Sequence, residues 1–156
     1  MEKQKDDTPG VIAPPPLIYL GFLVLSLALD YFWPVRFLPE SWRIPLAVLL
    51  IVAGAALVTL GLGEFRRVGT EVSPLRPSTA LATGGIYRYT RNPLYVSLAA
   101  IYLGIAAATN GLWILLLAIP LLVVIRYGVI AREERYLEAK FGEAYRQYKG
   151  RVRRWM

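Results

Sequence analysis

The side chains best suited to chemistry gather in residues 84–95, GGIYRYTRNPLY. Pro93 suits the first turn of a helix and Asn92 suits the position before it, so the spacing predicts a helix that begins here. A helix N-terminus beside Arg88 and Arg91 attracts an anion, either a carboxylate or a phosphate. The alternative is that these arginines only orient the chain in a membrane and contact lipid phosphates.

Two adjacent acids, Glu133 and Glu134, form a second group. Carboxylates accept hydrogen bonds from an amine or from the hydroxyls of a ribose. Together the two groups could bind a zwitterion, with its carboxylate on the arginines and its amine on a glutamate. The acids could instead only form ion pairs with the arginines around them.

Two residue types are missing, because the 156-residue chain contains no Cys and no His. Their absence excludes disulfides, thiolate nucleophiles, Ser-His-Asp triads and zinc or haem sites that need these ligands. We therefore predict no metal site. Any reaction at this protein must proceed without an imidazole base or a thiol.

Four apolar runs must position these groups, at about residues 17–33, 44–63, 94–108 and 112–130. At ~1.5 Å per residue the longer runs extend roughly 25–30 Å, which is enough for a bilayer core. A soluble protein is a poor alternative, since four nearly uncharged helices would leave little polar surface. The sequence predicts an all-α integral membrane protein of about four transmembrane helices, with residues 1–156 forming a single domain.

The chain combines 56% hydrophobic residues with a formal charge of +7, and the basic residues are segregated. With four spans, sixteen of the 18 Lys and Arg residues fall on one side, together with both termini and the loop 64–92. The positive-inside rule makes that side cytoplasmic, and the membrane would be the inner or plasma membrane if the organism is a prokaryote. The net positive charge is thus explained by the orientation of the chain in the membrane. For this reason we predict no nucleic-acid partner.

The segments between and beside the spans have distinct compositions. Residues 1–13 are mostly polar and predict a disordered cytoplasmic tail without a cleavable signal peptide. The cytoplasmic loop 64–92 is long and rich in Gly, Pro, Ser and Thr, which is typical of a functional loop. Residues 131–156 place apolar side chains at helical spacing, which predicts a cytoplasmic amphipathic helix, bent near Gly142, that could bind lipid head groups.

The same motifs resemble the isoprenylcysteine carboxyl methyltransferase family, which is related to the phospholipid N-methyltransferases. The family pattern is Arg-His-Pro-x-Tyr, a hydrophobic hairpin, Glu-Glu, and a tail with Leu, Phe-Gly and two Tyr. This chain has Arg91-Asn92-Pro93-Leu94-Tyr95, Glu133-Glu134, Leu137, Phe141-Gly142, Tyr145 and Tyr148 at those positions. The resemblance covers roughly residues 61 to 150.

The resemblance implies a methyltransferase that uses S-adenosylmethionine on the cytoplasmic face and modifies a lipophilic or prenylated acceptor. It implies a cofactor site made of Gly85, Tyr87, Arg91, Asn92, Pro93, Tyr95, Glu133 and Glu134. For catalysis we predict that Arg126 orients an acceptor carboxylate, and that Glu133 takes a proton from an amine acceptor.

Two positions depart from the family pattern. Asn92 replaces its His, and the ending after Val152 lacks its Pro. Asn can hold a cofactor by hydrogen bonds but cannot titrate near neutrality, so a proton-exchanging role would be lost. This leaves open a non-catalytic membrane scaffold or lipid-binding protein. The small residues Ala100, Gly104 and Ala108 form a stripe on the third run that could serve a dimer or the fold, so the oligomeric state stays open.

Overall fold

The computed structural model describes residues 7–155, and within them every regular element is helical. The part of the predicted disordered tail at residues 1–6 lies outside the described residues. The elements are α1 (Pro15–Phe32), α2 (Glu40–Val68), the 3-10 turn η1 (Gly85–Arg88), α3 (Pro93–Thr109), α4 (Leu112–Val124), the π-helical turn η2 (Ile125–Ile130), α5 (Ala131–Phe141) and α6 (Glu143–Arg151).

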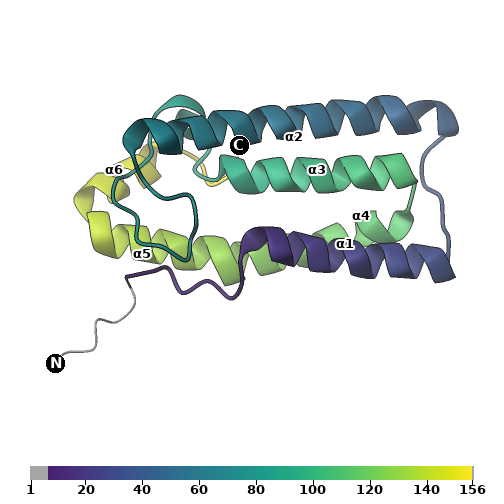
Figure 1. The fold of residues 1–156 in the computed structure, drawn as a ribbon, viewed down its shortest axis with the longest axis horizontal. Coiled ribbons are helices and arrows are strands. Elements are labelled where there is room, and N and C mark those ends of the chain that lie inside the picture. Colours follow the sequence, from purple (N-terminus) through teal and green to yellow (C-terminus); the bar gives the residue numbers. More distant parts are fainter. Residues whose placement is uncertain (1–6, 156) are drawn as a thin grey trace.

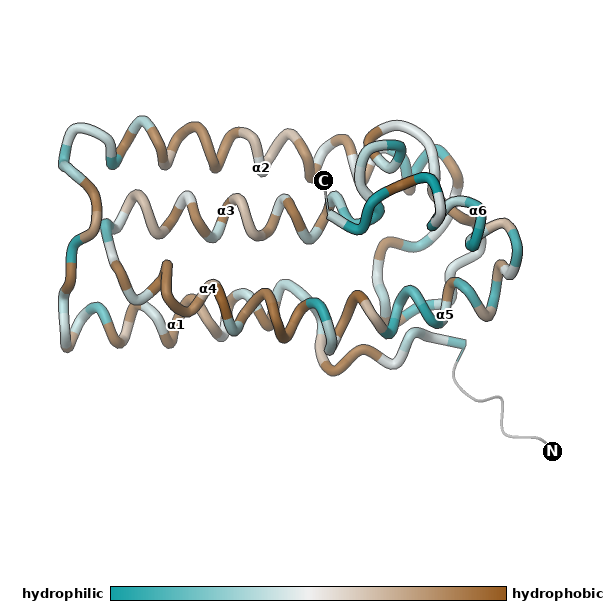
Figure 2. Tube along the Cα trace, turned by 180° about the vertical axis from the view of Figure 1, so that it is seen from behind, coloured by the Kyte–Doolittle hydropathy of each residue, from teal (hydrophilic) through white to brown (hydrophobic). Residues whose placement is uncertain are grey.

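The helices form an elongated bundle in which α2 lies beside α3, and α1 lies beside α4 (Figure 1). Within residues 7–155, three helices are long and apolar enough to cross a membrane, namely Pro15–Phe32, Glu40–Val68 and the continuous Leu112–Phe141. The other apolar helix, α3, has 17 residues. Figure 2 shows hydrophobic residues along the bundle and hydrophilic residues concentrated at the end that holds α5 and α6.

Small residues allow α2 and α3 to approach closely. A Cβ atom at Gly54 would lie 2.6 Å from Ile101 Cγ1, and one at Gly104 would lie 2.6 Å from Ile51 Cγ1. Either addition would push the two helices apart, because these neighbours are packed between the backbones. Gly104 of the small-residue stripe therefore packs inside the fold.

At the end opposite α5 and α6, Asn110 ties the two interhelical connections together. It adopts the left-handed conformation with φ 56°, which asparagine tolerates better than most residues. Its side-chain oxygen accepts hydrogen bonds from the backbone N–H groups of Phe37 (3.1 Å) and Leu38 (2.8 Å). Its amide donates to the Leu38 carbonyl at 2.9 Å, so the α3–α4 hairpin is fixed against the α1–α2 loop.

The second apolar run extends further as a helix than its hydropathy predicts. Residues 64–68 include the charged Glu64, Arg66 and Arg67 but contain no helix breaker, so α2 continues to Val68 and ends where Gly69 adopts a left-handed conformation (φ 70°). The loop predicted to begin at residue 64 therefore begins at Gly69. As a result Glu64 and Arg67 stand on a rigid helix.

The region predicted as an amphipathic helix bent near Gly142, residues 131–156, forms two helices that are separated at Gly142. α5 continues from α4 through η2. The helix is interrupted at Gly142 (φ 53°), and α6 follows it. The hydroxyl of Tyr148 on α6 donates to the Tyr87 carbonyl of η1 at 2.8 Å. α6 thus returns toward the loop that carries the predicted site, and residues 152–155 follow it without regular structure.

Candidate functional site

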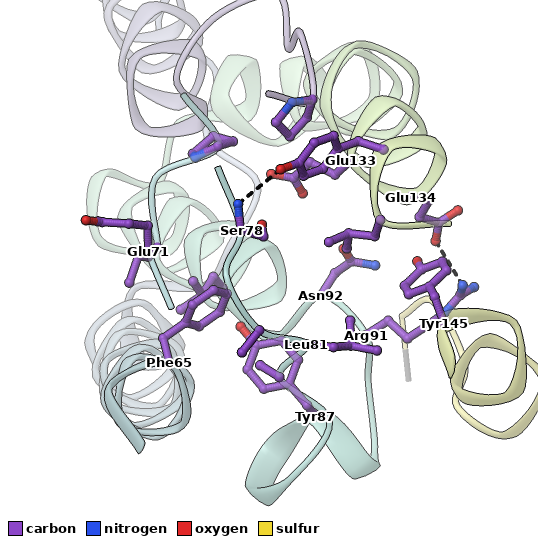
Figure 3. Close-up of a pocket in the computed structure, with 18 of the residues that line it drawn as sticks. Phe65, Glu71, Ser78, Leu81, Tyr87, Arg91, Asn92, Glu133, Glu134 and Tyr145 are labelled. Atoms are coloured by element: carbon purple, nitrogen blue, oxygen red, sulfur yellow. Dashed lines mark hydrogen bonds and ion pairs between the residues drawn. The ribbon is translucent and has the colours of Figure 1, made fainter. Parts of the chain in front are cut away.

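A pocket opens at the polar end of the bundle, where several parts of the chain meet (Figure 3). Its walls come from the end of α2, the loop after it, η1, the start of α3, α5 and α6, and Pro9 adds a contact from the N-terminal segment. Six of the eight predicted cofactor residues line this pocket: Tyr87, Arg91, Asn92, Tyr95, Glu133 and Glu134.

Arg91 stands just before α3, and its side chain is only 9% exposed. Among residues 7–155 its Nε and Nη1 atoms have no hydrogen-bond partner. Nη1 lies 3.2 Å from Glu134 Oε1, which is close enough for an ion pair although the geometry of a hydrogen bond is not met. Unsatisfied donors on a buried guanidinium are costly, so this group is suited to an anionic ligand.

Glu134 is buried and its carboxylate is fully engaged by another arginine. Arg154 donates from Nε to Oε1 at 2.9 Å and from Nη2 to Oε2 at 2.6 Å. This paired arrangement is the strongest geometry that an arginine and a carboxylate can adopt. Both oxygens of Glu134 therefore already accept a hydrogen bond within the protein.

Glu133 lies on α5, beyond the apolar stretch that ends at Ile130, and it faces the pocket. The Tyr95 hydroxyl donates to Glu133 Oε1 at 2.6 Å. Burial raises the pKa of Glu133 to about 7, against the lowering effect of the Tyr95 hydrogen bond, and the nearby Glu134 charge adds to the increase. A carboxyl group in this condition can exchange a proton near neutral pH.

Asn92 occupies the position before α3 and Pro93 is the first helical residue, but the Asn92 side chain does not cap the helix. Its Nδ2 instead donates to the Arg154 carbonyl at 2.8 Å. The residue that replaces the family His thus contacts both the pocket and the C-terminal tail.

Aromatic side chains form another wall of the pocket. Tyr87 is buried and meets Phe65 edge to face, with ring centroids 5.6 Å apart. Both rings line the pocket together with Tyr145 and Leu81. Such a wall suits a planar ring, so the pocket combines groups for a carboxylate, an ammonium and an aromatic base.

The structure places the other predicted residues outside the pocket lining. Gly85 (φ +52°) and Gly84 form a turn that docks on α2, where the Gly84 N–H donates to Glu64 Oε1 at 3.0 Å. Pro93 is buried at the start of α3. Arg126 is exposed, and its guanidinium carbon lies 5.4 Å from the Tyr127 ring centroid. Arg126 is not among the residues that line this pocket, and its predicted role in orienting an acceptor stays a prediction.

The sequence interpretation did not include the N-terminal segment in the site. Residues 7–13, predicted as part of a disordered tail, lie along α5, where Arg132 donates to the Gly10 carbonyl at 2.7 Å. The Tyr136 hydroxyl accepts from the Ser78 N–H at 3.1 Å and donates to Asp7 Oδ1 at 3.0 Å. Arg154 was likewise missed, because its role depends on a return of the chain that spacing alone does not indicate.

Comparisons with known proteins found a family model and two relatives that match this chain. The model of the phospholipid methyltransferase family matches residues 42–144. Methanethiol S-methyltransferase 1 of Bradyrhizobium diazoefficiens is 36% identical over 154 residues, covering 86% of this chain and 51% of that protein. An uncharacterized protein of Haemophilus influenzae is 60% identical over 35 residues, covering 22% of this chain and 56% of that protein. This chain spans about half the length of these curated relatives, and no solved structure matches it.

Proposed function

Because this chain belongs to the phospholipid methyltransferase family, we propose that it is an integral membrane methyltransferase that uses S-adenosylmethionine. The observation that carries the proposal is the buried Arg91 guanidinium, which lines the pocket together with Glu133 and whose Nε and Nη1 make no hydrogen bond among residues 7–155. Amino-acid-bearing cofactors present a carboxylate and an ammonium, which are the complementary charges.

The residues present fit this cofactor. Arg91 would hold its carboxylate, Glu133 would face its amino group or the acceptor, and Phe65 with Tyr87 would contact its adenine ring. When bound, the cofactor supplies a methyl group already activated by a sulfonium. The protein therefore has mainly to align the acceptor and exclude water, which requires neither Cys nor His.

Glu133 extends the chemistry to acceptors that must first lose a proton. A thiol or a protonated amine becomes nucleophilic only after deprotonation, and Glu133 Oε2 can take that proton while Tyr95 holds Oε1. A carboxylate acceptor would need no such base. Proton exchange at Glu133 would also explain how the chain can function with Asn92 where the family has His.

For the acceptor we favour a lipophilic molecule, either an isoprenylcysteine carboxylate or another lipid-like substrate. The pocket adjoins the apolar helices, so such an acceptor would reach it from the bilayer while the cofactor arrives from water. A small thiol is a second candidate. It is favoured by the relative named for methanethiol and by the pKa of Glu133 near 7.

We extend the proposal to topology. α3 lies beside α2 and would form the fourth span, which places both termini and the pocket on the cytoplasmic side under the positive-inside rule. Membrane lipids would surround the exposed apolar side chains of the bundle.

The test is transfer of a labelled methyl group from S-adenosylmethionine by membranes that contain the protein. Label in solvent-extractable lipid would identify a lipophilic acceptor, and label in a volatile thioether after addition of methanethiol would identify a thiol acceptor. Membranes with the Arg91→Ala variant serve as the control. If neither fraction gains label above that control, the chain is instead the non-catalytic scaffold or lipid-binding protein that its departure at Asn92 left open.

A further inference from the structure

The C-terminal tail, defined here as residues 152–155, packs against the segment that leads into α3. The Arg91 N–H donates to the Arg153 carbonyl at 3.0 Å, and Asn92 Nδ2 donates to the Arg154 carbonyl at 2.8 Å. Trp155 packs against the core formed by α1, α3 and α4. These hydrogen bonds and the packing of Trp155 fix the backbone of Arg154 beside the pocket.

The side chain of Arg154 returns from this anchored backbone to Glu134. It takes both carboxylate oxygens, at 2.9 Å and 2.6 Å, and the Glu134 side chain is only 8% exposed. Arg91 also approaches this carboxylate, with Nη1 3.2 Å from Oε1, and within the described residues 7–155 neither its Nε nor its Nη1 makes a hydrogen bond. One buried carboxylate thus serves two guanidiniums, and Arg154 holds it in the better geometry.

This arrangement decides what Arg91 can bind. Two arginines beside one paired carboxylate leave one positive charge without a full partner in a buried place, which favours an added anion. Without Arg154, the free carboxylate of Glu134 would attract the Arg91 guanidinium and compete with a ligand for it.

We propose that Arg154 is a positioning residue, which occupies Glu134 and thereby keeps Arg91 available for the carboxylate of the bound ligand. The inference rests on the proposed use of S-adenosylmethionine and adds a residue outside the motif that suggested it. Asn92 contributes by anchoring the Arg154 carbonyl, and an amide can make this hydrogen bond at any physiological pH.

The experiment compares two ligands by calorimetric titration of the full chain in detergent: S-adenosylmethionine and its decarboxylated analogue, which lacks only the carboxylate. The wild type should prefer the first. Arg154→Ala should weaken its binding by about 10- to 100-fold, the range for loss of a charge-assisted contact, and leave the analogue's affinity nearly unchanged. Arg151→Ala removes the same charge from an exposed position and should change neither affinity.

A second variant separates positioning from a general structural role and avoids an unpaired buried carboxylate. In Glu134→Gln/Arg154→Ala the competitor for Arg91 is neutral, so the preference for S-adenosylmethionine should return toward the wild-type value. The proposal is overturned if Arg154→Ala weakens both ligands equally, if it weakens neither, or if the double variant stays as weak as Arg154→Ala. A wild type that binds both ligands equally also overturns it, whereas a wild type that binds neither refutes the proposed function itself.

Discussion

Two acids that are adjacent in the sequence have different environments in the structure. Both oxygens of Glu134 pair with Arg154, whereas Glu133 faces the pocket with one hydrogen bond from Tyr95. Successive residues on a helix point about 100° apart, so neighbours on α5 reach different partners. The sequence identifies the two acids as candidates for the site. Which of them can contact a ligand depends on the C-terminal tail, whose Arg154 pairs with Glu134.

The pKa of Glu133 leads to a prediction for pH dependence. Burial raises this pKa to about 7, and the carboxylate form is the one that can accept a proton. With a thiol or amine acceptor, the methyl transfer rate should rise as pH increases through about 7 and level off above it.

Glu133→Gln should lower that rate by about 100-fold and remove the rise, because the amide cannot take a proton. The measurement is the transfer rate at saturating cofactor over a range of pH values. Exposed Glu143→Gln is the matched control and should keep the wild-type profile. An unchanged profile in Glu133→Gln would show that another group, or none, removes the proton.

At the scale of elements, the apolar runs predicted the helices well, because a hydrophobic stretch and its flanking Pro or Gly residues act locally. The predicted end of the second run, at residue 63, is too early, because α2 continues to Val68. Hydropathy cannot distinguish polar residues on a continuing helix from polar residues in a loop. The contact of the loop residue Gly84 with Glu64 on α2 was also not predicted. A Cβ atom at Gly84 would clash with the Glu64 carboxylate, which is a contact across twenty positions of the chain.

The N-terminal segment and the loop after α2 are both hydrogen-bonded to the Tyr136 hydroxyl on α5, and this contact gives a second prediction. Tyr136 joins the Ser78 N–H to Asp7, and Pro9 from the same segment lines the pocket. Tyr136→Phe removes both tethers, so bound cofactor should dissociate about three to ten times faster.

Displacement of a fluorescent cofactor analogue in a stopped-flow instrument measures this rate. Tyr127→Phe is the control, because Tyr127 is 63% exposed and does not line the pocket. Equal dissociation rates in the two variants would mean that this hydroxyl does not hold the pocket closed.

At the scale of the whole molecule, charge segregation predicted an orientation but not how the bundle closes. The approach of α2 to α3 at Gly54 and the tie at Asn110 are tertiary features that a single sequence does not show. The return of the C-terminal tail to Asn92 is also a tertiary feature that a single sequence does not show.

The proposed topology can be tested with cysteine labelling, since the chain has no Cys of its own. Leu75→Cys lies in the loop beside the pocket and Ser41→Cys near the start of α2 at the other end of the bundle, and both positions are exposed. A membrane-impermeant maleimide should label Ser41→Cys in intact cells and Leu75→Cys only after the membrane is opened. Labelling of both from one side would contradict the four-span arrangement.

The most direct test of the account is calorimetric titration of the purified full chain with S-adenosylmethionine. We predict saturable binding at one site per chain, weakened about 100-fold or more in Arg91→Ala, because a buried charge-assisted contact to the carboxylate is lost. The Arg151→Ala variant should bind like the wild type. Absence of binding by the wild type up to millimolar concentration would contradict the central claim that this pocket holds the methyl donor.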